Sequence, residues 1–344
     1  ADAMRIMGPD SPGASAARLN LAATYRDASR LDEAITLYKQ NLDNVTRIMG
    51  PQDPQTLTAR NQLAGAYWEV GRLDDAISLF EQNLTDFIRT LGLDHPETLA
   101  SRHSLAGAYQ AASRLDDAIP LFEQNLEDRT RTLGLDHPET LASRHSLAGA
   151  YRDAGRLDEA IPLFEQNLTD FIRILGPDRP DTFTSRSTLA GAYQAASRLD
   201  DAIPLFEQNL EDRTRTLGPA HPVTLISRGN LANAYREAGR LDEAIHLFEQ
   251  NLTDFTHVVG PDHPEILAWR DKLAGAYQAA GRLDQTIALF EQNLEDRTRT
   301  LGPDHRDTLA SRNNLARWYL PCCGEIRGGE EALRDAVRIL FRRR

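Results

Sequence analysis

The chain has 344 residues, a formal net charge of −12 at pH 7 and only two cysteines. The negative charge argues against a general nucleic-acid or membrane-surface binder, and no apolar run approaches the length of a membrane span. The cysteines are adjacent at positions 322 and 323, so they cannot build a disulfide framework, and they lack the other ligands of a zinc site. We therefore expect a cytoplasmic protein.

A 42-residue segment recurs along the whole chain. The copies begin at Asp10, Gln52, Asp94, Asp136, Asp178, Ala220 and Asp262, and an altered eighth copy begins at Asp304. A fixed period of this length predicts a solenoid, because each unit can bury its apolar face only by stacking on its neighbours. We expect residues 10–303 to form seven helix-pair repeats and residues 304–344 to form a divergent eighth repeat with a C-terminal capping helix.

Residues 1–9 resemble the end of the second helix of a repeat, as in residues 46–51. They are therefore expected to be the tail of a preceding helix. This start inside a repeat also predicts that a longer protein carries a further, N-terminal effector domain before residue 1.

Each junction between copies carries the residues that end one helix and begin the next. Gly134 is expected to close a helix in the left-handed conformation. Asp136 is the expected N-cap, Pro138 is expected in the first turn, and Glu139 is expected to complete a capping box.

The third copy shows the expected helices most clearly. Helix A is predicted from about Pro96 to Ala112 and helix B from about Leu115 to Thr132, with a Ser-Arg or Gly-Arg turn between them. Helix B also contains proline in three copies, near the fifth residue after the turn. Pro120, Pro162 and Pro204 should each remove at most one early backbone hydrogen bond, so helix B is expected to continue through them.

Apolar residues follow helical spacing in both segments. Leu105, Ala106 and Tyr109 share one stripe of helix A, while Leu115, Ala118, Phe122 and Leu126 share one stripe of helix B. This pattern resembles the tetratricopeptide repeat. The 42-residue length and the LG-x-DHP-x-T-L junction resemble the variant found in kinesin light chain and in actinobacterial multidomain proteins. The resemblance implies an all-α fold, a right-handed α-solenoid of antiparallel helix pairs.

The copies alternate late in helix B. Copies two, four and six carry Thr-Asp-Phe at 85–87, 169–171 and 253–255, whereas copies three, five and seven carry Glu-Asp-Arg-Thr. Duplication of a two-repeat block explains this pattern without a functional meaning, and a recognition array with variable groove residues is the alternative. The eighth copy departs after Tyr319, where Pro-Cys-Cys-Gly is expected to replace the turn.

No catalytic constellation is found in the sequence. The histidines of the Asp-His-Pro junctions recur one repeat apart and are expected to mark helix starts rather than to converge on a metal. There is no phosphate-binding loop and no nucleophile beside a plausible base. We expect a protein that is not an enzyme and needs no cofactor.

Helix A carries a second stripe, at positions such as 103, 107 and 110, distinct from the apolar one. The family resemblance implies that ligands lie on the concave face that the A helices line. The candidate ligand-binding residues on this stripe are Arg26, Asn61, Trp68, His103, Gln110, His145, Arg152, Gln194, Asn233, Arg236 and Gln278. Five mid-helix glycines follow the same stripe, at 65, 107, 149, 191 and 275. They indicate close approach of either a ligand or a neighbouring helix.

These candidate residues include arginines and a tryptophan, which are the types that anchor interfaces. Arg26, Arg152 and Arg236 stand against one acid, Asp271, inside an acidic protein. The stripe therefore favours an extended, acidic protein or peptide segment as ligand.

Two polar rows depart from the usual pattern of the repeat and are expected to be structural. Arg occupies one helix-A position in every copy, at 18, 60, 102, 144, 186, 228, 270 and 312; Asn occupies one helix-B position, at 41, 83, 125, 167, 209, 251 and 293. A buried guanidinium needs partners. In particular Arg60, Arg102, Arg144, Arg186 and Arg228 should bond Asn83, Asn125, Asn167, Asn209 and Asn251, or the Asn of the preceding copy, with Asp128 and its equivalents as countercharge.

The leading functional hypothesis is a non-enzymatic scaffold, the partner-sensing part of a larger signalling protein. In the family that the chain resembles, such arrays often stand beside a signalling ATPase domain. The alternatives are a cargo adaptor like kinesin light chain, a structural or self-associating solenoid, and a receptor for a small peptide or small molecule.

Overall fold

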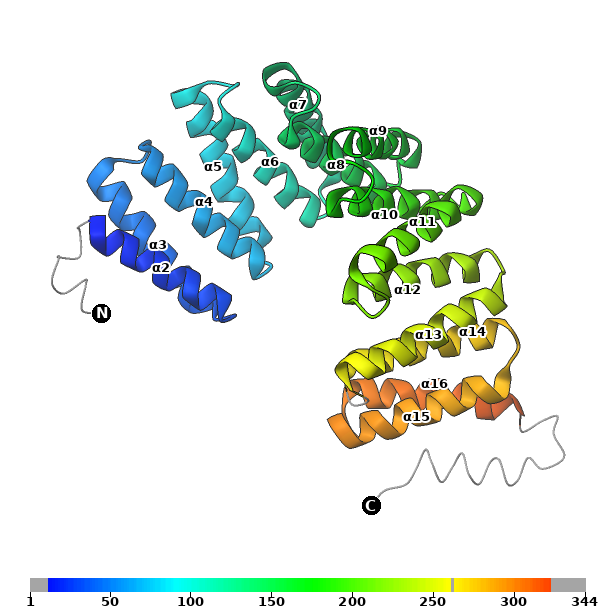
Figure 1. The fold of residues 1–344 in the computed structure, drawn as a ribbon. Helices are drawn as coiled ribbons and strands as arrows, with labels where there is room; N and C mark the ends of the chain where they lie inside the picture. The colour runs from blue at the N-terminus through cyan, green and yellow to red at the C-terminus, as the bar shows by residue number, and fades with distance from the viewer. Residues whose placement is uncertain (1–11, 261–262, 323–344) are drawn as a thin grey trace. The chain divides into compact units, whose positions relative to one another are not determined.

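The computed structural model describes residues 12–260 and 263–322, and this part of the chain is built from α-helices without a β-strand. Figure 1 shows the helices, which follow one another as antiparallel neighbours. In chain order they are α2 (Pro12–Asp27), α3 (Leu31–Met49), α4 (Pro54–Glu69), α5 (Leu73–Leu91), α6 (Pro96–Ala111), α7 (Leu115–Leu133), α8 (Pro138–Asp153), α9 (Leu157–Leu175), α10 (Pro180–Ala195), α11 (Leu199–Leu217), α12 (Pro222–Glu237), α13 (Leu241–Val259), α14 (Pro264–Ala279), α15 (Leu283–Leu301) and α16 (Arg306–Cys322).

Even-numbered helices are the A helices and odd-numbered helices are the B helices. The predicted all-α solenoid of helix pairs is confirmed, and the predicted bounds of α6 and α7 are correct to one residue. The contacts divide the chain into two compact units, Ala1–Ile174 and Leu175–Arg344.

The helix start differs from the prediction by one residue. His137, not Asp136, is the N-cap of α8, and its Nδ1 accepts from the backbone N–H of Glu139 at 3.2 Å. Pro138 is the first helical residue, so Glu139 is too close to the cap to form a capping box. Asp136 instead binds Arg173 at the end of α9. The histidines thus mark helix starts, as predicted, and they do so through a ring nitrogen.

The helix end also differs in conformation. Gly134 caps α7 with φ 88° and ψ 166°, so it has the positive φ expected but lies outside the left-handed helical region. Its N–H donates to the carbonyl of Thr130 at 3.1 Å. A Cβ built on Gly134 would meet no atom within 4 Å, so the backbone conformation, not lack of space, requires glycine here.

The A–B turn has a left-handed residue in every described copy. Glycine takes this position at 71, 155, 239 and 281, whereas Ser29, Ser113 and Ser197 take it with φ of 58–59°. A residue with a Cβ loses about 1 kcal/mol in this region. We therefore expect Ser113→Gly to raise the free energy of unfolding by about 1 kcal/mol, measured by urea denaturation. Gly155→Ser should lower it by a similar amount, and no change in either variant would contradict the argument.

Helix B continues through its prolines, as predicted. The helices α7, α9 and α11 each run unbroken over 19 residues, with Pro120, Pro162 and Pro204 inside them. All three prolines are exposed, so their rings meet solvent rather than a neighbouring helix.

The core follows the predicted apolar stripes. Leu105, Ala106 and Tyr109 of α6 are buried, as is Phe122 of α7, while Leu126 is half-buried. The tyrosine of helix A also reaches the preceding copy, because the Tyr151 hydroxyl donates to a carboxylate oxygen of Glu123 at 2.5 Å. Small alanines and large rings together let consecutive helices approach closely.

The arginine row is buried and paired with acids. Arg60, Arg144 and Arg228 each donate to an aspartate at 2.7 Å and to the Asn of their own copy at 3.2–3.3 Å. The matching aspartates are Asp86, Asp170 and Asp254. This confirms the predicted partners in copies two, four and six, and it makes the row part of the repeat's framework.

In copies three, five and seven the Asn has other partners, so the predicted Arg–Asn bond is wrong there. Arg102, Arg186 and Arg270 still bind an aspartate, at 2.5–2.7 Å. The Asn side chains turn to other polar groups: Asn125 donates to Ser143, Asn209 to Ser187 and Asn293 to Asp271.

The alternation late in helix B coincides with this difference. The Arg that replaces Phe in copies three, five and seven crosses to helix A of the next copy, where Arg129 donates to Ser143 Oγ at 2.8 Å. Arg213 donates to Ser227 in the same way, and Arg297 to Ser311. Where Phe stands instead, as at Phe87 in copy two, the equivalent hydroxyl of Ser101 is buried without a hydrogen-bond partner among the described residues. The alternation therefore decides which side chains cross between copies.

This gives a matched pair of serine variants. We expect Ser143→Ala to lower the free energy of unfolding by about 2 kcal/mol, because the buried Arg129 guanidinium loses an acceptor. Ser101→Ala should be neutral or stabilising, because it removes a buried hydroxyl that has no partner. Urea denaturation followed by circular dichroism compares the two. Equal losses in both variants would show that the crossing bond contributes nothing.

The chain ends are only partly described. The expected turn at Pro321 and Cys322 is wrong, because α16 continues to Cys322. The expected helix tail at residues 1–9 and the capping helix near the C-terminus lie outside the described residues.

Candidate functional site on the A helices

Helix A has a single stripe that is not buried. In α6, packing buries Thr98, Leu99, Ser101, Arg102, Leu105, Ala106, Ala108 and Tyr109. This leaves the stripe around positions 103, 107 and 110, and equivalent stripes occur on the other A helices. The A helices α6 and α8 also contact each other directly. We call the surface made by these stripes within each unit the helix-A face.

All eleven predicted ligand-binding residues lie on this face, and none of them is buried. Four are exposed: Arg26, Asn61, Arg152 and Gln278. Seven are half-buried: Trp68, His103, Gln110, His145, Gln194, Asn233 and Arg236. The face is therefore accessible at every predicted position, although several side chains are engaged within the protein.

The two histidines pack against helix B. The rings of His103 and Phe122 are 5.5 Å apart and meet edge to face, and His145 and Phe164 repeat this arrangement. Burial, together with the nearby Arg129, lowers the pKa of His103 to about 4. Burial lowers the pKa of His145 as well. Both rings are thus neutral near pH 7 and form part of the wall of the face.

Trp68 explains one of the glycines. A Cβ on Gly107 would lie 2.6 Å from Cη2 of Trp68, so this glycine admits a neighbouring side chain. Trp68 also meets Phe80 edge to face, with 6.2 Å between ring centroids. By contrast, a Cβ on Gly65 or Gly191 would meet nothing within 4 Å. The backbone is therefore open to a ligand at these two positions.

Acids next to the predicted ligand-binding stripe offset part of its positive charge. Arg152 pairs with Asp153 at 3.1 Å, and Gln110 donates to the same carboxylate at 2.7 Å. Arg26 lies 3.9 Å from Asp27 and 4.0 Å from Glu69. Asp27, Glu69 and Asp153 each follow a predicted ligand-binding residue by one position, so they lie outside the predicted stripe and were not counted with it. The positive charge expected from Arg26 and Arg152 is thus largely balanced.

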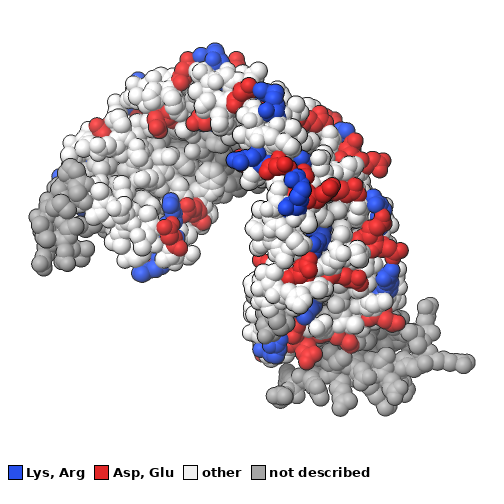
Figure 2. All heavy atoms as spheres, viewed as in Figure 1, with Lys and Arg blue, Asp and Glu red and all other residues white. Residues whose placement is uncertain are grey.

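On the visible face of the second unit, acidic and basic side chains are interleaved and do not form one broad basic patch (Figure 2).

In the second unit, Arg236 and Lys272 are cations of the helix-A face that differ from Arg26 and Arg152 because no acid of the described helices offsets their charge. Among the described residues neither forms an ion pair with a carboxylate. The one acid of the predicted ligand-binding stripe, Asp271, is bound to Arg297 at 2.8 Å. Lys272 Nζ lies 4.2 Å from the ring centroid of Trp269. Burial and the charge of Arg236 lower the pKa of Lys272. Lys272 was missed because it stands one residue outside the predicted stripe.

The described helices include none long and apolar enough to cross a membrane. Within residues 12–260 and 263–322 no group of three or more His, Cys, Asp or Glu side chains is arranged to hold a metal ion.

A family profile described as tetratricopeptide repeat matches residues 13–87, 59–124, 97–169, 145–208, 181–257, 230–285 and 265–339. No curated protein sequence matches the chain.

Several solved structures are similar. A protein of Podospora anserina, described as a kinesin light chain with nearly identical tetratricopeptide-like repeats, is 36% identical, with a TM-score of 0.57 over 60% of this chain and 98% of that one. The BtubC (BKLC) protein of P. vanneervenii is 19% identical, with a TM-score of 0.56 over 68% of this chain and 95% of that one.

A signal-transduction ATPase with numerous domains from Pyrococcus horikoshii, which has a tetratricopeptide repeat sensor, is 14% identical. Its TM-score is 0.62, over 95% of this chain and 47% of that one. At this identity the similarity concerns the fold alone.

Proposed function

Because the chain belongs to the tetratricopeptide repeat family and is of the kinesin-light-chain-like type, we propose that it holds an extended protein or peptide segment along the helix-A face. Repeats of this family serve in general as protein–protein interaction scaffolds without catalysis, and we extend both properties to this chain. The supporting observation is that the stripe of helix A left unburied recurs from copy to copy. A ligand that follows the face would therefore meet similar side chains at regular intervals.

The open glycines support an extended ligand. Gly65 and Gly191 leave backbone uncovered on the face, and a peptide backbone can approach such positions closely. Asn61, Gln194 and Asn233 offer amide groups nearby, which can bond the main chain of a ligand without regard to its sequence.

A preference for acidic segments rests on the second unit. Arg236 and Lys272 are the cations of the face without a carboxylate partner among the described residues, and the exposed Lys272 ammonium lies over the ring of Trp269. A carboxylate placed between them would gain two charge-assisted hydrogen bonds. Arg26 and Arg152 contribute less, because each already has an acid within 4.0 Å.

The experiment is titration of a fluorescein-labelled acidic peptide library into the protein, read by fluorescence anisotropy. We expect the Arg236→Ala/Lys272→Ala variant to weaken the best acidic peptide at least tenfold, and Arg152→Ala to change it less than threefold. Saturable binding that both variants leave unchanged would contradict the acidic preference. No saturable binding of any peptide, together with dimers in light scattering, would favour a self-associating solenoid.

The proposal extends to the larger protein. We propose that the array is the partner-sensing part of a cytoplasmic signalling protein, by analogy with the Pyrococcus horikoshii signal-transduction ATPase, which has a tetratricopeptide repeat sensor. The full open reading frame tests this, because an adjoining nucleotide-binding domain is expected there. An adjoining motor-binding segment would favour the cargo-adaptor alternative.

A further inference from the structure

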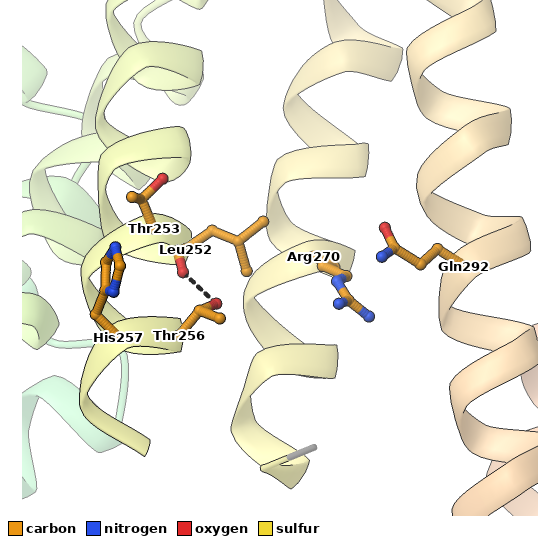
Figure 3. Close-up of a pocket in the computed structure, with 6 residues that line it drawn as sticks. All are labelled: Leu252, Thr253, Thr256, His257, Arg270 and Gln292. Carbon is orange, nitrogen blue, oxygen red and sulfur yellow. Dashed lines mark hydrogen bonds between the residues drawn. The ribbon is translucent and has the colours of Figure 1, made fainter. Parts of the chain in front are cut away.

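A pocket of about 310 Å³ opens between α13 and α15, with α14 as its floor, on the side of the B helices (Figure 3). Leu252, Thr253, Thr256 and His257 line it from α13, Arg270 from α14 and Gln292 from α15. All of these residues belong to the second unit. Five of the six lining residues lie on B helices and Arg270 belongs to the buried arginine row, so the pocket is separate from the helix-A face and from Arg236 and Lys272.

The sixth copy lacks an ion-pair bridge that other copies have. In copies three to five an arginine near the end of helix B joins the junction aspartate to the aspartate that binds the buried arginine, as Arg215 joins Asp178 and Asp212. In copy six His257 replaces this arginine and Ala220 replaces the junction aspartate. The Asp254 side chain is accordingly 35% exposed, against 14% for Asp212. His257 therefore lines the pocket instead of completing a bridge.

The pocket wall is short at Thr256, a position where most copies carry threonine. Thr256 stands where copies two and four carry Ile88 and Ile172. Its hydroxyl donates to the carbonyl of Leu252 at 2.6 Å, a bond that Figure 3 marks, so the side chain is held against its own helix. An isoleucine here would carry one more side-chain heavy atom into the space above Arg270.

The lining is rich in hydrogen-bond donors and contains no carboxylate. Arg270 is 7% exposed, is bound to Asp296 through one nitrogen, and is one of the residues that line the pocket. The Gln292 amide and the His257 imidazole add further donors, and Leu252 supplies an apolar wall. The volume is at the small end of the range for ligand sites.

We propose that this pocket binds a small carboxylate that has an apolar body. The carboxylate would accept hydrogen bonds from Arg270 and Gln292, and the apolar body would lie against Leu252. A carboxylate suits the site because a guanidinium and an amide present paired N–H groups to it, and charge-assisted bonds are the strong ones. Occupancy would link α13 to α15 across α14 and so stiffen two consecutive copies.

Benzoate is the probe, titrated into the protein and followed by saturation-transfer NMR, with inorganic phosphate in a parallel titration. We expect saturable binding of benzoate. Thr256→Ile, which restores the residue of copies two and four, and Gln292→Leu should each weaken it at least fivefold. Thr214→Ile and Gln208→Leu alter the equivalent positions of copy five, outside the pocket, and should leave benzoate binding unchanged.

Circular dichroism of each variant confirms that the helices are intact. Absence of saturable benzoate binding would overturn the proposal, and so would equal losses in the copy-five controls. Tighter binding of phosphate than of benzoate would overturn the assignment to a carboxylate with an apolar body.

Discussion

Replacing Arg144 with methionine is expected to lower the free energy of unfolding by about 3 kcal/mol, because a buried carboxylate loses its partner. The Arg144 side chain is 3% exposed and binds Asp170, which is 14% exposed, at 2.7 Å. Methionine keeps most of the apolar stem of arginine, so the loss reports the charge and its hydrogen bonds. Urea denaturation followed by circular dichroism measures it.

The double variant separates pairing from packing. Asn167 also donates to the carbonyl of Leu141 at 3.0 Å, so its loss would remove a second bond. We therefore choose Asp170→Leu, rather than Asn167→Ala, as the second change. The Arg144→Met/Asp170→Leu variant is expected to recover about 1–2 kcal/mol of the stability lost in Arg144→Met. Arg173→Met removes an exposed partner of the same aspartate and should cost less than about 1 kcal/mol. A loss in Arg144→Met no larger than that in Arg173→Met would show that the row is not a structural framework.

The pair also has a pH signature. Burial acts to raise the pKa of Asp170, but hydrogen bonds from Arg173 and Arg144 outweigh it, and the pKa lies below its ordinary value of 3.8. A carboxylate with a lowered pKa stabilises the fold above pH 3.8, and this contribution is lost as the pH falls through the folded-state value. The Arg144→Met/Asp170→Leu variant should therefore lose less stability than the wild type between neutral pH and that acid range.

The second large effect is expected at Gly229, which lies under a tryptophan. A Cβ at this position would lie 2.7 Å from Cζ3 of Trp269, and still closer to Cη2. Trp269 is 8% exposed, so its ring has little room to move. Gly229→Ala should therefore lower the free energy of unfolding by about 2 kcal/mol, although alanine is the better helix former. Trp269 fluorescence during urea denaturation follows the change.

Gly191 provides the matched control in the same unit. It is also a mid-helix glycine of an A helix, but a Cβ there would meet nothing within 4 Å. We expect Gly191→Ala to raise the free energy of unfolding by about 1 kcal/mol, because only the helix preference changes. Destabilisation of similar size at both positions would mean that the packing of Trp269 is not what requires Gly229.

The repeat pattern alone was enough to predict the helices and their order. The 42-residue period, the junction glycines and prolines, and the stripe of Leu105 and Tyr109 act locally, through backbone conformation and helical spacing. The same pattern also showed that the buried Arg144 row needs acidic partners, because an unpaired guanidinium in a core is too costly.

The partners of individual side chains depended on packing between copies. His137 rather than Asp136 became the N-cap, since Arg173 draws the aspartate away. Trp68 covers Gly107 from a different helix. Asp153 offsets the charge of Arg152 although it stands outside the predicted ligand-binding stripe. Long side chains reach across stripes and across copies. Which of two nearby acids or rings they meet depends on how neighbouring helices are placed, and residue spacing within one helix does not contain that information.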